Sequence, residues 1–308
     1  MVRHTIIVTA DERQRKLAGL LDGQFVNVEK EVWEERLSGR NYPEDELCES
    51  VYILPVPLSK LDNNLEIKEK LKRELINDAC DANVAVKVFA GVIGEEWECF
   101  FEDHGICYWD LMKLPEVVEG NAWITAEATV AEVLRYGSYS IEGQKVLVTG
   151  YGCCGKKIAD LFARLGAKVL VVARREEVCE EARRDGHEAI SFMEYNQIVA
   201  GAGAESETSA LVRQVKTIIN TVPAPVINES HIKVLSSDAL IIDIASKPGG
   251  TDFDAAKKYG ITARLSLGLP GIYTTTSSAL LLKKAISKYA PLPKNVSEDK
   301  LWIFQIII

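Results

Sequence analysis

Three glycines with the spacing G-x-G-x-x-G, at Gly150, Gly152 and Gly155, are the clearest chemical signal in the chain. They follow an apolar run at 145–149 and precede a segment with helically spaced apolar residues, the context that a dinucleotide-binding turn requires. The first glycine permits the tight bend, the second lets the backbone approach a pyrophosphate, and the third lets helix and strand pack closely. Amides at the helix N-terminus then face the anion. We therefore predict a dinucleotide site, over the alternative of a glycine turn without a ligand.

Two adjacent cysteines, Cys153 and Cys154, lie inside the same turn. A helix N-terminus stabilises a thiolate, so reactive sulfur chemistry is one interpretation. The other is that two small side chains fit beside a phosphate, and we favour it and assign both residues to cofactor binding. The chain has seven cysteines in all. No C-x-x-C pair occurs among them, so neither a disulfide framework nor a zinc cluster is indicated.

The end of the next predicted strand indicates which dinucleotide binds. An NAD site usually carries an acidic residue there for the ribose 2′-hydroxyl. This chain has Arg174 and Arg175 instead. Two guanidinium groups suit a 2′-phosphate through charge-assisted hydrogen bonds. We therefore predict NADP rather than NAD, the alternative being two solvated arginines at the start of an exposed helix.

Polar loops follow three later strands, at 220–223, 243–252 and 268–271. In open α/β sheets the carboxyl-end loops bind the ligand. From these loops we assign to the cofactor Asn220, Thr221, Val222, Pro223 and Asp243.

The loop after Asp243 also suggests a place for an acidic substrate. We predict that Lys247 and the amides of Gly249 and Gly250 hold a carboxylate. A histidine acid/base is absent from this region, because His4, His104, His187 and His231 all lie outside 265–276. Carbonyl reduction by a histidine–carboxylate pair, Ser-His-Asp hydrolysis and metal hydrolysis are therefore disfavoured.

The elements that must position these residues alternate between strand and helix throughout the chain. This alternation predicts an α/β fold with a flavodoxin-like or Rossmann-like N-terminal domain and a doubly wound, parallel-sheet NAD(P)-binding Rossmann domain. The domains expected are 1–120 on the substrate side, a linking helix at 122–137, and the Rossmann domain at 138–272. A helix within 273–290 is expected to pack back on the first domain. The tail 291–308 receives no role, 111–121 is expected to be a linker, and 200–209 an exposed loop.

Composition limits the class of protein. The 308 residues are 47% apolar and 26% charged, with a net charge of −9. Such a chain is a globular protein, and its acidity disfavours binding to nucleic acids or anionic membranes. No stretch approaches the ~20 apolar residues of a membrane-spanning helix. With the cysteine pattern and no signal peptide, we expect a cytoplasmic protein.

The block from Asp243 to Phe253, followed by Leu267 to Ile272, resembles the family of the A-type, oxidoreductase subunit of dipicolinate synthase. Shorter matches occur at Asp11 to Gln14, Ile53 to Val56 and Thr125 to Thr129. With the glycine turn and the loop at 220–223, the resemblance covers about residues 3–289. Thr9 and Ala10 depart from the glycines that the family has before Asp11.

The resemblance implies an oxidoreductase that converts dihydrodipicolinate to dipicolinate, with NADP accepting hydride. It implies work in the mother cell of a spore-forming bacterium, together with the flavoprotein-like B-type subunit of dipicolinate synthase, and we expect a homo-oligomer. Candidate ligands of the dicarboxylate are Arg13, Thr125 and Lys247, and Glu127 is the candidate proton acceptor. A helix-start ion pair for Arg13 and a surface carboxylate for Glu127 stay open. Other open functions are a different imino- or hydroxyacid dehydrogenase and a non-catalytic NADP-binding protein.

Overall fold

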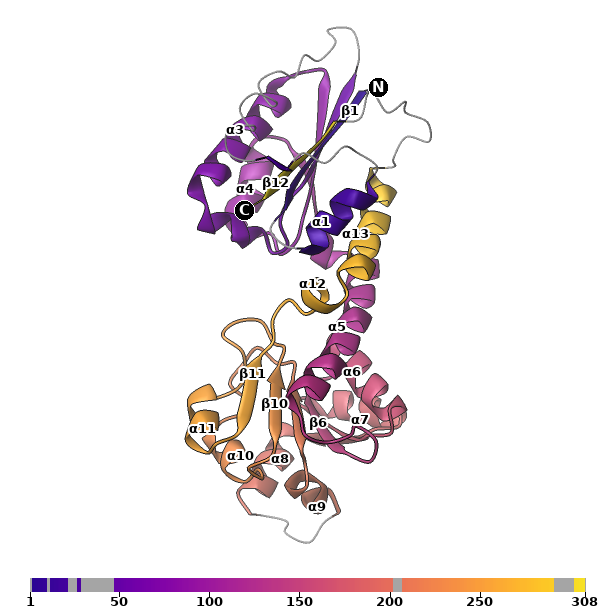
Figure 1. The fold of residues 1–308 in the computed structure, drawn as a ribbon, viewed down its shortest axis with the longest axis vertical. Helices are drawn as coiled ribbons and strands as arrows, with labels where there is room; N and C mark the ends of the chain where they lie inside the picture. The colour runs from indigo at the N-terminus through magenta and orange to yellow at the C-terminus, as the bar shows by residue number, and fades with distance from the viewer. Residues whose placement is uncertain are drawn as a thin grey trace. The chain divides into compact units, whose positions relative to one another are not determined.

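The computed structural model describes residues 2–9, 12–21, 27–28, 47–201, 207–290 and 302–307, and of these it gives only the backbone for 2–4, 9, 27–28 and 302–307. The chain divides into two compact units (Figure 1). The first unit contains Met1–Asn121 and Thr274–Ile308, and the second contains Ala122–Tyr273. Both are α/β units built on parallel sheets, so the predicted fold class is confirmed.

The sheet of the first unit has the order β2-β12-β1-β3-β4-β5, and every neighbouring pair is parallel. Its strands are β1 (Val2–Thr9), β2 (Asn27–Val28), β3 (Cys48–Ile53), β4 (Val84–Ala90), β5 (Cys107–Asp110) and β12 (Trp302–Ile307). The C-terminal tail thus supplies a strand beside β1, the first strand of the chain.

Helices cover both faces of this first sheet. They are α1 (Glu12–Leu20), η1 (Leu58–Asn63), α3 (Leu65–Cys80), α4 (Glu95–Asp103), η2 (Leu111–Lys113) and α13 (Thr275–Tyr289). Apolar residues of α3 and α4 form one core layer with the sheet. Those of α1 and α13 form the other, and the two helices lie side by side (Figure 1).

The sheet of the second unit has the order β11-β10-β9-β6-β7-β8, again all parallel. Its strands are β6 (Lys145–Thr149), β7 (Lys168–Ala173), β8 (Glu188–Ser191), β9 (Thr217–Asn220), β10 (Leu240–Asp243) and β11 (Thr262–Leu265). Since β6 lies between β7 and β9, the strand order reverses at β6, where a doubly wound sheet opens a crevice at its carboxyl edge.

Two helical layers enclose the second sheet. One contains α5 (Pro115–Tyr136), α6 (Cys153–Arg164) and α7 (Glu176–Arg184). The other contains α8 (Phe192–Val199), α9 (Glu207–Arg213), α10 (Glu229–Lys233) and α11 (Phe253–Lys258). A short helix, α12 (Pro270–Tyr273), ends the unit. The inner strands β6, β7, β9 and β10 are nearly continuous apolar runs because both of their faces are buried.

Two sequence expectations about connections are wrong in part. The span 111–121 is not a linker, because α5 begins at Pro115, and proline is well tolerated in the first helical turn. The expected loop at 200–209 contains the start of α9 at Glu207, while 202–206 lies outside the described residues. Helix α4 and strand β5 were not predicted.

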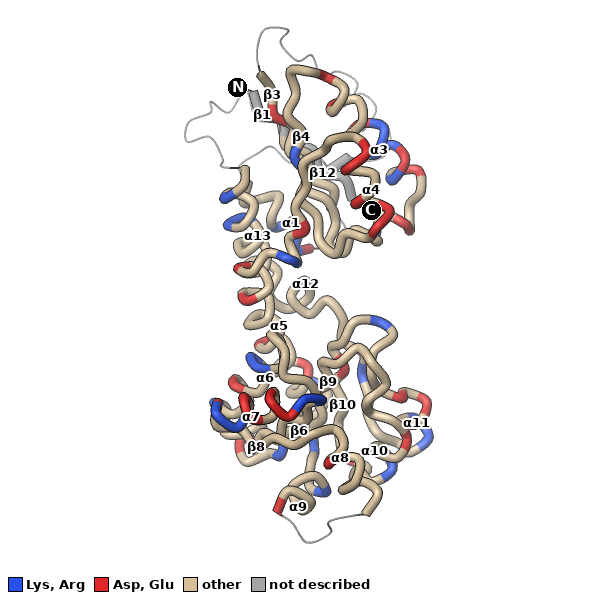
Figure 2. The backbone as a smooth tube through the Cα atoms, turned by 180° about the vertical axis from the view of Figure 1, so that it is seen from behind, with Lys and Arg blue, Asp and Glu red and all other residues tan. Residues whose placement is uncertain are grey.

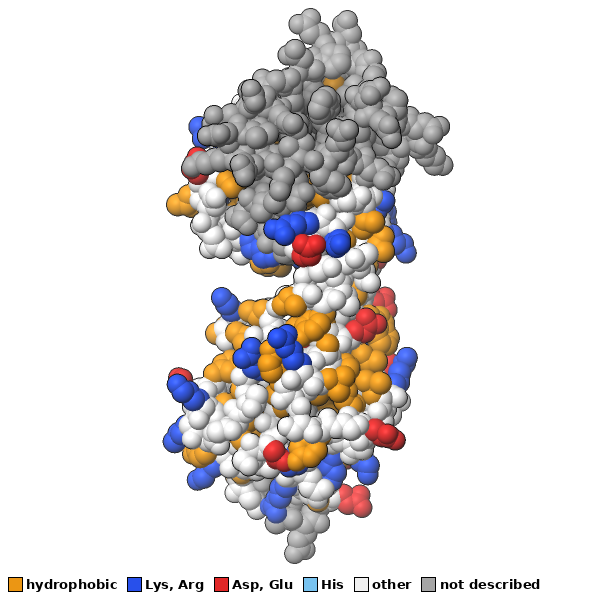
Figure 3. Space-filling view, in the orientation of Figure 1, with side chains coloured by type: hydrophobic (Ala, Val, Ile, Leu, Met, Phe, Trp, Pro, Cys, Tyr) orange, Lys and Arg blue, Asp and Glu red, His pale blue; other side chains and the backbone are white. Residues whose placement is uncertain are grey.

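Charges are gathered on the helices and loops around the sheets, and α7 carries both signs (Figure 2). On the face in view, acidic and basic side chains are scattered over the second unit rather than gathered in one basic patch (Figure 3). Among the described residues, no helix is long and apolar enough to cross a membrane. The same part of the chain contains no group of three or more metal-ligating side chains.

Candidate functional site

The glycine turn joins the carboxyl end of β6 to the N-terminus of α6. Gly150 has φ +85°, and a Cβ there would lie 2.5 Å from Thr221 Oγ1. A Cβ on Gly155 would lie 2.3 Å from the carbonyl oxygen of Gly150. Both glycines are therefore required by the packing of the protein itself.

The packing of the protein does not require a glycine at position 152. Gly152 is the N-cap of α6, with φ −82° and ψ −165°, and a Cβ there would meet no atom within 4 Å. The open space lies at the helix N-terminus, where the first amides have no partner inside the helix. A pyrophosphate is the group that this space and these donors suit, so the turn fits a dinucleotide.

Tyr151 lies between the first two glycines and anchors the turn to a neighbouring helix. Its ring is buried, and its hydroxyl donates a 2.8 Å hydrogen bond to Asp185 at the end of α7. Burial, followed by the Asp185 carboxylate, raises the pKa of Tyr151 above its usual value. The phenol therefore stays a donor and fixes the turn against α7.

Asn220 ends β9 and is fully buried. Its Oδ1 accepts from the Thr149 hydroxyl at 2.5 Å and from the Val222 amide at 3.1 Å, and its Nδ2 donates to the Val222 carbonyl at 3.0 Å. The next residue, Thr221, donates its hydroxyl to the Thr149 carbonyl at 2.8 Å. Asn220 therefore shapes the turn at 220–222 beside the glycine turn, and its contact with a cofactor stays a prediction.

Asp243 ends β10 and is also fully buried. Its carboxylate accepts from the amide of Ala245 at 3.0 Å and from that of Gly250 at 2.8 Å. Gly249 donates its amide to the carbonyl of Ser246 at 2.8 Å. The amides of Gly249 and Gly250 are thus turned into the loop, which corrects the expectation that they bind a substrate carboxylate.

The same loop packs against the turn after β9. A Cβ on Gly250 would lie 2.5 Å from the carbonyl oxygens of Val222 and Ala224 and 2.6 Å from Asn220 Nδ2. The structure therefore brings together, through contacts, the glycine turn, the 220–222 turn and the Asp243 loop. Lys247 lies at the exposed tip of that loop, and Pro223 is exposed on the neighbouring turn.

Arg174 and Arg175 follow β7 and are both exposed. Arg175 is the N-cap of α7, and within the described part of the chain neither guanidinium has a hydrogen bond or ion pair. The nearby Glu176 is held by Arg183 at 2.7 Å, so this carboxylate already has a cation. Two uncommitted guanidinium groups at this edge suit a 2′-phosphate.

The adjacent cysteines open α6. Cys153 is exposed, and Cys154 is partly buried. Burial, followed by the neighbouring sulfur, raises the pKa of Cys154, so its thiol is held neutral rather than activated. This favours the interpretation of two small side chains beside the turn over sulfur chemistry.

One carboxylate that the sequence did not single out is central to the second unit. Glu132 of α5 is buried, and its two oxygens accept the hydroxyl hydrogens of Ser266 and Tyr273. These partners bracket the segment that follows β11. The Ser266 amide donates to the Asp243 carbonyl at 2.7 Å, which ties this segment to the Asp243 strand end. Sequence periodicity marks a helical position but not its distant partners, so no local signal reveals this contact.

The remaining predictions on α5 concern Thr125 and Glu127. Thr125 is buried and its carbonyl accepts the Thr129 hydroxyl at 2.8 Å, whereas Glu127 is exposed. At ~100° per residue, Glu127 projects about 140° around the helix from Glu132. Their catalytic and substrate roles stay predictions.

Arg13 belongs to the first unit, and its surroundings connect two of the short motifs that match the family. Its buried guanidinium donates to the Val56 carbonyl at 3.3 Å, and Gln14 Nε2 donates to the Leu54 carbonyl at 3.0 Å. The motif at 11–14 thus contacts the motif at 53–56, at the carboxyl end of β3. A role for Arg13 in substrate binding stays a prediction.

Comparison with known proteins gives a family and a fold. The family described as alanine dehydrogenase/PNT, C-terminal domain, matches residues 117–301. The A-type subunit of dipicolinate synthase from Bacillus subtilis is 33% identical over 178 residues, which are 58% of this chain and 56% of that protein. The match thus spans little more than half of the relative's length. These matches confirm the resemblance to the A-type subunit of dipicolinate synthase that the motifs indicated.

Two solved structures share the fold across the chain. The A-type subunit of dipicolinate synthase from Bacillus halodurans superposes with a TM-score of 0.68 at 22% identity, covering 94% of this chain and 98% of that one. A transhydrogenase from Sinorhizobium meliloti gives a TM-score of 0.57 at 12% identity, covering 94% and 92%. At these identities the likeness concerns the fold alone.

Proposed function

Because this chain belongs to the alanine dehydrogenase/PNT C-terminal domain family, we propose that it is an oxidoreductase that oxidises dihydrodipicolinate to dipicolinate with NADP. The observation that carries the proposal is Gly152, a glycine that the fold does not require and that leaves open space at the helix N-terminus. Family membership supports a nicotinamide dinucleotide in general. Arg174 and Arg175, which have no partner among the described residues, favour the 2′-phosphorylated form.

The bound dinucleotide would accept the hydride, and the chain would orient the substrate relative to the dinucleotide. Aromatisation of a dihydropyridine ring is favourable, so orientation matters more than strong acid–base groups. Two electrons and one hydrogen leave the ring as hydride, and a second hydrogen leaves as a proton. Glu127 is the proposed acceptor of that proton, because its carboxylate is exposed and has no described partner.

Lys247 is the proposed ligand of a substrate carboxylate. It is exposed, lies at the tip of the loop that Asp243 orders, and has no described ion pair. Arg13, on the first unit, and Thr125 are proposed as further ligands. The name of the Bacillus subtilis relative identifies it as one part of a larger enzyme. We extend the proposal to a second, flavoprotein-like partner (the B-type subunit of dipicolinate synthase), a homo-oligomer, and a cytoplasmic role in the mother cell during sporulation.

The test supplies the protein with NADP and a system that generates dihydrodipicolinate, with and without the B-type partner, and follows dipicolinate absorbance and NADPH together. The proposal predicts equal amounts of both products. It also predicts that Lys247→Ala raises KM at least about tenfold, whereas Lys257→Ala, at an exposed lysine of α11, leaves it unchanged.

Other outcomes would replace the proposal. NADP binding without turnover in either condition would indicate a non-catalytic cofactor-binding protein. Turnover confined to open-chain imino or hydroxy acids would indicate a different dehydrogenase on the same scaffold. Turnover that persists unchanged in Glu127→Gln would remove that residue as proton acceptor.

A further inference from the structure

Val92 adopts a backbone conformation that its own side chain disfavours. It follows β4, its φ is +55°, and it is the only non-glycine residue with a positive φ in the part of the chain that the structure describes. A β-branched residue rarely enters this left-handed region, because its Cβ crowds the following carbonyl oxygen, whereas glycine enters it freely. The turn itself therefore favours glycine, and the valine calls for another reason.

The neighbouring strand end holds this backbone in place. Asp110 ends β5 and is buried, and its Oδ1 accepts the Val92 amide at 3.0 Å while its Oδ2 accepts the Ile93 amide at 3.1 Å. These bonds involve backbone amides alone, so they would form equally well with glycine at position 92. They explain how the strained conformation persists, but they do not explain the valine side chain.

Internal packing does not explain the side chain either. Val92 is 58% exposed, whereas the next residue, Ile93, is 7% exposed and belongs to the core of the first unit. A lone exposed apolar residue needs no explanation where it costs nothing. Here the side chain costs backbone strain, and strained residues of this kind gather at ligand-binding sites. Its exposure leaves it accessible to a ligand.

Val92 lies at the edge of the first-unit sheet where a ligand is expected, because open α/β sheets bind ligands outside the carboxyl ends of their strands. Contacts connect it to Arg13, the proposed substrate ligand of this unit. A Cβ on the preceding Gly91 would lie 2.7 Å from Val56 Cγ1, and the Val56 carbonyl accepts a 3.3 Å hydrogen bond from the Arg13 guanidinium. A cation and an exposed apolar group thus flank the carboxyl end of β3.

We infer that Val92 is a specificity-determining residue whose methyl groups pack against the face of a flat, cyclic carboxylate held by Arg13. The inference rests on the proposed function, whose substrate is such a ring. An aliphatic side chain gains from covering an apolar ring face, and an open-chain acid with the same spacing of carboxylates offers no such face. Val92 therefore favours ring substrates over open-chain ones.

The experiment compares two dicarboxylates with the same spacing between their carboxyl groups, dipicolinate, which is a ring, and glutarate, which is an open chain. Each is titrated calorimetrically into the full chain in metal-free buffer, with and without NADPH. The KM and kcat for dihydrodipicolinate are measured in parallel. The parent chain should bind dipicolinate at least about tenfold more tightly than glutarate.

Two variants separate the ring contact from the strain. Val92→Gly removes both, so it should raise Tm by about 2–4 °C while weakening dipicolinate at least about fivefold. Val92→Thr keeps the β-branched shape and the strain but replaces a methyl group by a hydroxyl, so Tm should stay the same while dipicolinate weakens at least about threefold. In both variants glutarate affinity should be unchanged, and KM should rise with kcat within about twofold of the parent value.

Val234 provides the matched control. This exposed valine is the C-cap of α10 and has an ordinary φ of −91°. Since valine suits that conformation, Val234→Gly should lower Tm and Val234→Thr should leave it unchanged. Neither substitution should change the affinity for dipicolinate.

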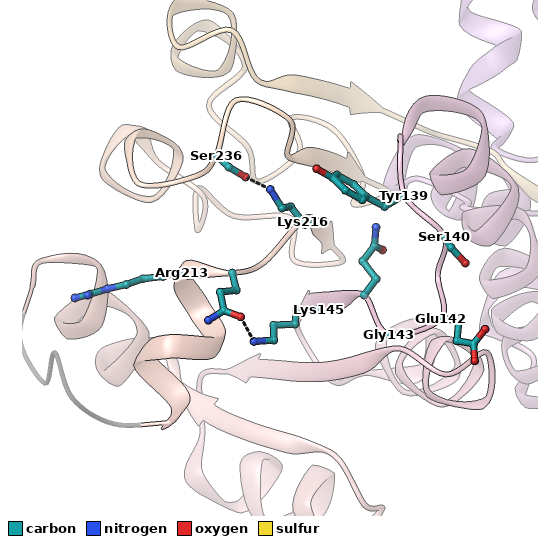
Figure 4. A pocket seen from close by; sticks show the side chains of 10 residues that line it. Tyr139, Ser140, Glu142, Gly143, Lys145, Arg213, Lys216 and Ser236 are labelled. Carbon is teal, nitrogen blue, oxygen red and sulfur yellow. Dashed lines mark hydrogen bonds between the residues drawn. The ribbon is translucent and has the colours of Figure 1, made fainter.

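A pocket of about 520 Å³ lies two residues beyond Val234, where Ser236 forms part of its wall (Figure 4). Its lining lysines, Lys145 and Lys216, are already held by neighbouring side chains. Figure 4 shows the side chain of Arg213 pointing away from them. Among the described residues, no lining cation is therefore left to hold a dicarboxylate, and the control should not be disturbed by binding there.

Four results would overturn the inference. They are glutarate binding to the parent chain as tightly as dipicolinate, dipicolinate affinity unchanged in both Val92 variants, equal weakening by Val92→Gly and Val234→Gly, and a lower Tm for Val92→Gly than for the parent chain.

Turnover distinguishes this inference from the proposed function. Dipicolinate binding that responds to Val92 without any turnover would contradict the proposed function and support the ring contact. Turnover of dihydrodipicolinate with an unchanged KM in both Val92 variants would support the proposed function and overturn the inference.

Discussion

The carboxylate of Asp243 accepts a 2.8 Å hydrogen bond from the amide of Gly250, seven residues further along the chain. With the second bond, from Ala245, it closes the loop that carries Lys247. Asp243→Ala would leave two buried amides without an acceptor, so we expect a loss of about 2–5 kcal/mol in the free energy of unfolding. Urea denaturation measures it, with Asp254→Ala on α11 as the exposed control. Equal stability of the two variants would refute this role.

Arg174 and Arg175 are predicted to select the cofactor. Replacing them by Asp and Ala removes two charge-assisted donors worth about 1.5–3 kcal/mol each, so the Kd for NADP should rise at least about 100-fold while that for NAD changes little. Fluorescence titration of the reduced cofactors measures both values. Arg184→Ala, on the same helix, is the control. An unchanged preference between the two dinucleotides would contradict the assignment.

Glu132 is predicted to clamp the segment after β11. Glu132→Ala removes the hydrogen-bond acceptor of the Ser266 and Tyr273 hydroxyls. It should lower the free energy of unfolding by about 2–4 kcal/mol. If the clamp acts as one unit, a double-mutant cycle with Tyr273→Phe should show a coupling of about 1–2 kcal/mol. Strict additivity of the two substitutions would show that the contact contributes nothing.

Stability is predicted to fall in mild acid because of His231. This buried imidazole lies between two asparagine side chains, with Nε2 2.8 Å from Asn196 Oδ1 and Nδ1 2.8 Å from Asn228 Oδ1. Burial lowers its pKa to about 4 from an ordinary 6.5. The neutral ring therefore contributes its full stability above pH 6.5, and this contribution is lost as the pH falls toward 4.

The expected loss over that interval is about 3 kcal/mol. Urea midpoints measured across pH 4–7 should fall more steeply for the parent chain than for His231→Gln. His104→Gln, at an exposed histidine, should follow the parent curve. Parallel curves for the parent chain and His231→Gln would show that this histidine is not responsible.

The sequence located the strand before the glycine turn well. The apolar run at 145–149 agrees with β6, which is buried along nearly its whole length. Such a run is bounded by turns, so local pattern suffices. The start of α5 was missed because residues 115–121 have no clear apolar period, and tertiary packing rather than pattern keeps them helical.

The site was predictable only in part. The glycine spacing and the arginine pair are local signals, and the structure places both at the carboxyl edge of the second-unit sheet. The sequence could not reveal that the side chains of Asn220 and Asp243 form hydrogen bonds to backbone groups of the protein's own loops. Nor could it reveal that the amides of Gly249 and Gly250 point into the loop. Those facts depend on contacts between loops that follow different strands, as does the contact of Glu132 with Ser266.

Gly152 gives the most direct test that a dinucleotide binds at the turn. A methyl group there meets no protein atom, so Gly152→Ala should match or slightly exceed the parent chain in unfolding free energy, whereas Gly155→Ala should lose stability. The decisive measurement is the Kd of NADP for folded Gly152→Ala. We predict a rise of at least about tenfold, because the methyl group would occupy the space of the pyrophosphate. An unchanged Kd in that folded variant would contradict it.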